Sequence, residues 1–171
     1  MDEFIKYLHG GDLRSIADVD QLIPLIKNQK NFDELFRFLS SEDRLVVMRT
    51  ADAAEKITKT HPAYLDPHKS EIIELLNNAK DKELKWHLAL MVSRIDLSEN
   101  ELERVWNKLE AWVRDKSESK IVRVNSLQAL YELSSLNKAL KRDFEIIIGD
   151  IKKENIPSIN ARINILKRDK L

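Results

Sequence analysis

Two histidines and an aspartate lie close together between two predicted helices. His61, Asp66 and His68 fall within eight residues, and imidazole nitrogen with carboxylate oxygen is a donor set that binds zinc. Their spacing matches no known metal motif, and histidines are common at surface turns. We therefore expect no metal here. If no metal binds, adding zinc should leave the melting temperature of the protein unchanged.

Little else in the composition points to catalysis. The chain has no cysteine and three glycines, which excludes thiol chemistry and a Gly-rich phosphate-binding loop. The sequence lacks a nucleophile elbow, and spacing singles out none of the many carboxylates as a general acid or base. We predict that the protein is not an enzyme and uses no cofactor.

Polar side chains recur at a constant spacing along the chain. This pattern indicates a binding surface and not a catalytic site. The interval from Arg49 to His87 equals the interval from His87 to Asn125. The same interval relates the residues one and two helical turns further on. These positions give the candidate partner-binding residues: Arg49, Asp52, Lys56, His87, Arg94, Asn125, Gln128 and Glu132.

Helices must position these residues. Three glycines and four prolines in 171 residues leave little room for β-turns, and apolar residues return at helical spacing along the chain. Trp86, Trp106 and Trp112 fall on apolar positions and are predicted core residues. The spacing and capping residues predict helices over 2–9, 20–28, 31–39, 41–60, 67–78, 81–95, 98–115, 119–133, 137–153 and 157–168.

The later helix of each pair repeats at a period of roughly 40 residues, which is typical of an α-solenoid. The segment with Asp115, Val122-Arg123, Ser126, Ala129-Leu130 and Leu133 resembles a HEAT repeat. The resemblance implies an all-α, right-handed α-solenoid (HEAT/ARM-like) of about four helix pairs. We expect a single domain, 1–171, in which 1–30 form an N-terminal helical cap and 31–171 the repeats.

In HEAT arrays the second helices line the concave face, and the arrays serve mainly as protein-binding scaffolds. The resemblance thus implies that the candidate row forms a groove for a peptide or a partner helix. An ordinary solvated face explains the same residues equally well. The resemblance also implies that Asp115 and Arg123 belong to an Asp/Arg ladder between repeats, and that Arg162 has the same role in the last unit.

Charge weighs against other partner classes. The formal net charge is +0, which disfavours strong binding to nucleic acid. A local patch of Lys138, Lys141, Arg142 and Lys152-Lys153 keeps nucleic acid as the alternative function. The first residues lack an apolar run, so we expect no signal peptide, no membrane association and a cytoplasmic location. Ile163 and Leu166 of the last helix need cover from the preceding pair or from another chain, and the oligomeric state stays open.

Overall fold

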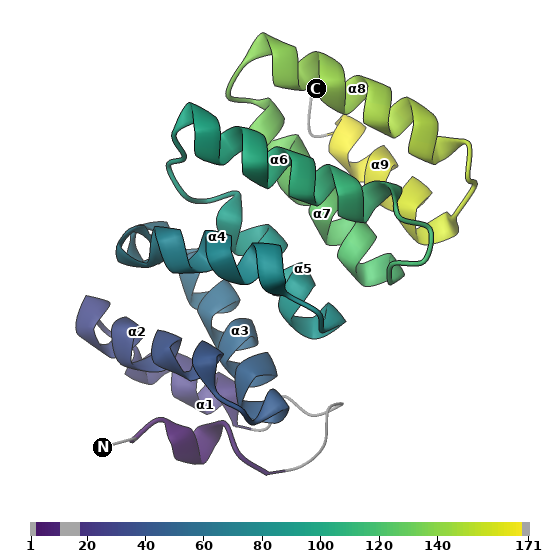
Figure 1. Ribbon diagram of the computed structural model, residues 1–171. Helices are drawn as coiled ribbons and strands as arrows, with labels where there is room; N and C mark the ends of the chain where they lie inside the picture. The colour runs from purple at the N-terminus through teal and green to yellow at the C-terminus, as the bar shows by residue number, and fades with distance from the viewer. Residues whose placement is uncertain (1–2, 11–17, 169–171) are drawn as a thin grey trace. The chain divides into compact units, whose positions relative to one another are not determined.

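The computed structural model describes residues 3–10 and 18–168. Its contacts divide the chain into two compact units, Met1–Lys69 and Ser70–Leu171. All regular elements of the described residues are helices (Figure 1). This confirms the predicted all-α class. The single-domain organisation and the right-handed sense of the array stay predictions.

The first unit begins with short elements. Instead of the predicted helix 2–9 it has a single 3-10 turn, and Gly10 follows with a positive φ of 86°, a conformation that glycine tolerates without strain. The predicted connection after Gly10 lies largely outside the described residues. The elements of this unit are η1 (Ile5–Tyr7), α1 (Val19–Leu22), η2 (Ile23–Leu25), α2 (Gln29–Phe36), η3 (Arg37–Ser40), α3 (Arg44–Thr58) and η4 (Pro62–His68).

The helix predicted to begin after an Asn31 cap is capped earlier, at Asn28. Asn28 is extended, and its side chain accepts a hydrogen bond from the backbone N–H of Asn31 at 3.0 Å. The side chain of Asn31 in turn accepts from the N–H of Lys27 at 3.3 Å. Both side chains thus accept backbone N–H groups at the start of this helix, one from within the helix and one from the residue before its cap.

The second unit consists of longer helices whose caps agree well with the sequence. Ser98 and Glu101 form the predicted capping box, and Ser119 and Asn137 cap their helices with their side chains. The helix that begins after Asp81 ends at Val92 instead of the predicted Ile95. The elements are α4 (Lys69–Asn78), α5 (Lys82–Val92), α6 (Glu99–Arg114), α7 (Lys120–Ser134), α8 (Lys138–Lys152) and α9 (Pro157–Arg168).

Within the second unit the hairpins α6–α7 and α8–α9 stack so that first helices face one way and second helices the other (Figure 1). The central helix α7 packs against α5, α6, α8 and α9, while α9 packs mainly against α7 and α8. Trp106 and Trp112 are buried as predicted, and Trp86 is half-buried. Ile163 and Leu166 are buried within the chain itself, so the preceding pair covers them.

Candidate functional site

The two histidines that were considered as metal ligands have different partners. His61 is exposed, stacks on Tyr64 and contacts the hydroxyl of Thr60 through Nδ1 at 2.9 Å. His68 instead places Nε2 2.7 Å from a carboxylate oxygen of Asp33. In the part of the chain that the structure describes, no group of three His, Asp or Glu side chains is placed to hold a metal ion.

The contact between Asp33 and His68 has a pH signature. Burial favours the neutral acid, but hydrogen bonds from Gln29 and His68 outweigh it and hold the pKa of Asp33 below its ordinary value. A depressed pKa contributes stability that is present above the unfolded-state pKa and is lost as pH falls through the folded-state pKa.

We therefore expect the first unit to lose stability as pH falls below about 4. In Asp33→Asn, the stability of the first unit should fall less over the same pH range. NMR titration of the Asp33 carboxyl group should give a higher pKa in His68→Ala than in the unmodified chain. An unchanged value would mean that His68 does not stabilise the carboxylate.

Two residues of the candidate row are buried and therefore do not lie on an exposed face. Arg49 is fully buried, and its Nη1 donates to the carbonyl of Leu8 at 2.7 Å. His87 is also buried, stacks on Trp86 and contacts the carbonyl of Glu83 through Nδ1. Both side chains serve the fold, because a buried polar group must find its partners inside the protein.

The other two row residues of the first unit form an ion pair on α3. Lys56 Nζ lies 2.9 Å from Asp52 and 3.2 Å from Asp20 on α1. Burial lowers the pKa of Lys56, but hydrogen bonds to both carboxylates outweigh it and raise the pKa above the ordinary value. These two partly exposed side chains are thus held in place from within the unit.

In the second unit two residues of the row, Gln128 and Glu132, belong to a hydrogen-bonded network that links α7 to α9 and to the segment after α5. Glu132 on α7 accepts hydrogen bonds from Ser93, which follows α5, and from Gln128 at 2.9 Å. Gln128 also accepts from Arg162 Nη1 on α9 at 2.7 Å. Ser93 and Glu132 are 39 residues apart, so this contact supports the predicted repeat period. We call Ser93, Glu132, Gln128 and Arg162 the polar network.

The last two row residues lie beside this network, one on α7 and one just beyond the end of α5. Asn125 is half-buried on α7, one turn before Gln128, and donates to the carbonyl of Ile121 in its own helix at 2.9 Å. Arg94 is half-buried just beyond α5 and next to Ser93. The row therefore presents partly exposed amide, carboxylate and guanidinium groups, of which Gln128 and Glu132 are held by bonds from outside their own helix.

A second set of cations recurs with the repeat. Lys85 on α5 pairs with Glu118, and Arg123 on α7 pairs with Glu154 at 2.8 Å. The two cations stand one repeat apart, and each carboxylate precedes the next second helix. Arg162 occupies the same position one repeat later, but it donates to the neutral amide of Gln128. We call Lys85, Arg123 and Arg162 the cation ladder.

The cation ladder corrects the role expected for Asp115. Arg123 donates to the carbonyl of Val113 and to Glu154, both at 2.8 Å. Asp115 is exposed and accepts from the hydroxyl of Ser117 at 2.6 Å and from its N–H at 2.8 Å. These bonds lower the pKa of Asp115. Asp115 closes a local turn, and Glu154 neutralises Arg123.

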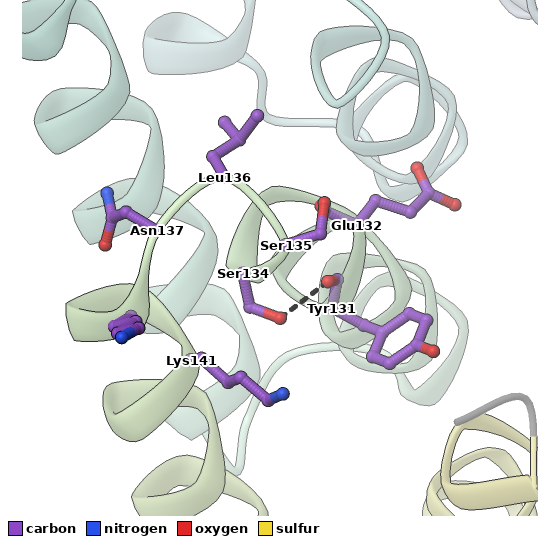
Figure 2. A pocket seen from close by; sticks show the side chains of 8 residues that line it. Tyr131, Glu132, Ser134, Ser135, Leu136, Asn137 and Lys141 are labelled. Carbon is purple, nitrogen blue, oxygen red and sulfur yellow. Dashed lines mark hydrogen bonds between the residues drawn. The ribbon is translucent and has the colours of Figure 1, made fainter. Parts of the chain in front are cut away.

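A pocket that the sequence did not indicate lies at the turn between α7 and α8 (Figure 2). It has a volume of about 720 Å³, and Glu132 is its one residue from the candidate row. Ser134 and Ser135 donate to backbone carbonyls three residues earlier, so neither hydroxyl is set up as a nucleophile. The lining residues are Tyr131, Glu132, Ser134, Ser135, Leu136, Asn137, Lys138 and Lys141.

The basic residues of the nucleic-acid alternative lie on or next to the first helix α8. Lys138, Lys141 and Arg142 belong to it, but the carboxylates of Asp143 and Glu145 are exposed on the same helix. This surface carries both signs of charge, which weakens attraction to a phosphate backbone. None of the helices in the described ranges has the length and hydropathy needed to cross a membrane.

The geometry of the second unit defines a class of protein in which helix hairpins stack, with one layer of first helices and one of second helices. Similar helical segments recur at a near-constant interval along the sequence. A sequence profile of the HEAT repeat domain matches residues 11–169. The chain therefore belongs to the HEAT repeat family. No curated protein and no solved structure matches the chain.

Proposed function

We propose that the protein is a non-catalytic scaffold that binds another protein or a peptide on the exposed side of α5, α7 and α9. Membership of the HEAT repeat family supports this, because such arrays commonly mediate protein interactions. The candidate contact residues in the second unit are Arg94, Asn125, Gln128 and Glu132. Asp52 and Lys56 are the corresponding candidates in the first unit.

The polar network is the single observation that carries this proposal. Hydrogen bonds fix Gln128 and Glu132 from both neighbouring helices, so a partner would meet side chains that are already ordered. Preorganisation lowers the entropy cost of binding. An ordinary solvated face has no need of such fixation, because exposed side chains gain little from it.

The test is a peptide-display selection on the full chain, followed by affinity measurements on synthetic versions of the selected peptides. Asn125→Glu adds bulk and charge to the row without removing a bond between helices, because Asn125 bonds only its own helix. We expect it to weaken binding about tenfold, which is about 1.4 kcal/mol.

The matched control is Asn107→Glu on α6, where the asparagine is exposed on a first helix. This variant should bind the peptides as the unmodified chain does. If no peptide is selected, or if both variants bind equally well, the row is not a binding site.

A further inference from the structure

Among the described residues, one cation of the cation ladder has no carboxylate partner. Lys85 and Arg123 each have a carboxylate from the segment before the next second helix, Glu118 and Glu154. Arg162 is half-buried and binds the amide oxygen of Gln128. Among the described residues no carboxylate pairs with it. A guanidinium forms its strongest contacts with carboxylates, in a bidentate geometry that a single amide oxygen does not provide.

Comparing α9 with α7, its equivalent one repeat earlier, identifies a solvent-exposed face on α9. Ala161, Ile165 and Arg168 recur at helical spacing on one side of this helix and are exposed, Ile165 by 44%. The residues one repeat earlier, on α7, are all fully buried in a helix that packs against α5, α6, α8 and α9. These equivalents are Val122, Ser126 and Ala129. A helix packed on α9 would cover Ile165 in the same way, and Ala161 is small enough for close approach.

The positive charge of α9 indicates the charge that a partner should carry. The helix carries Arg162, Lys167 and Arg168 and has no aspartate or glutamate between residues 157 and 168. On the adjacent α7, Glu132 already accepts bonds from Ser93 and Gln128. Two α9 faces would repel each other, which disfavours a second copy of the chain, whereas an acidic segment is attracted.

We propose that the exposed face of α9 binds an acidic, helix-forming segment of another protein. The segment places a carboxylate on Arg162, as Glu154 does on Arg123, and an apolar side chain on Ile165. This rests on the proposed function and adds the chemistry of the partner, since Arg162 meets the candidate row at Gln128.

The selected peptides provide the test. They should be rich in Asp and Glu, with apolar residues three or four positions apart. Arg162→Gln should weaken their binding at least about tenfold, and Arg162→Lys should weaken it less. Ile165→Asp should also weaken binding. The matched control is Ile146→Asp on α8, whose isoleucine is 61% exposed, and it should leave affinity unchanged.

Several results would overturn the proposal. Neutral or basic selected peptides would do so, as would equal affinity for Arg162→Gln. Peptides that respond to Asn125→Glu but not to Arg162→Gln would overturn this inference and leave the proposed function standing, whereas a selection without binders ends both. A dimer in light scattering that Ile165→Asp dissociates would assign the face to self-association. A gel shift of duplex DNA abolished by Arg162→Gln would assign it to nucleic acid. If Arg162→Gln does not fold, Ile165→Asp decides the question.

Discussion

Replacing Arg123 with methionine is expected to lower the free energy of unfolding of the second unit by about 3 kcal/mol. The guanidinium is buried and holds both Glu154 and the carbonyl of Val113. Methionine fills much of the space but leaves both oxygens without their donor. Glu154 remains 15% exposed, so water recovers part of the loss.

Urea unfolding followed by tryptophan fluorescence measures this effect, because Trp86, Trp106 and Trp112 are the three tryptophans of the chain and all lie in the second unit. The matched control is Arg114→Met. Arg114 pairs with Glu110 and Asp150 while 39% exposed, and exposed pairs contribute about 1 kcal/mol or less. Equal losses in the two variants would contradict a structural role for the Arg123 pair.

Replacing Arg49 with methionine is expected to destabilise the first unit by about 2 to 3 kcal/mol, the range for a hydrogen bond to a charged group whose buried partner is left unsatisfied. The bond from Arg49 to Leu8 ties α3 to the N-terminal segment across 41 residues. Because Leu8 is fully buried, losing this bond should also loosen the segment around it.

Hydrogen exchange measured by mass spectrometry separates this local effect from global unfolding. Exchange should rise in residues 3–10 and in α3 and stay unchanged in α6 and α7. Arg37→Met makes the same chemical change at an exposed position of η3 and should shift stability by less than about 0.5 kcal/mol. Unchanged exchange in residues 3–10 of Arg49→Met would show that Arg49 does not hold the segment.

The fold class and the repeat could be predicted because they rest on short-range patterns. Helical spacing and capping residues such as Ser98, Ser119 and Asn137 act within one turn, so the sequence shows them directly. The constant interval between similar segments predicted which helices are equivalent. The contact between Ser93 and Glu132 confirms neighbouring second helices in the second unit.

The burial of Arg49 and His87 could not be predicted in this way. Polar residues on one helix face look the same in sequence whether water or a distant backbone carbonyl satisfies them. The partner of Arg49 is the carbonyl of Leu8, and no local pattern indicates it. The pairing of Glu154 with Arg123 was not predicted, because the two residues are far apart in the sequence. A signal for it does exist, since a glutamate precedes both α7 and α9, at Glu118 and Glu154.

The cation ladder also has a consequence for how the second unit unfolds. Lys85 and Arg123 each pair with a carboxylate from the segment before the next second helix. Fraying that starts at α9 and displaces Glu154 therefore leaves Arg123 without its counter-charge. Detaching the hairpin that bears Glu118 then does the same to Lys85. Unfolding of the second unit should accordingly proceed hairpin by hairpin from the α9 end, because each hairpin that detaches removes a counter-charge from the hairpin before it.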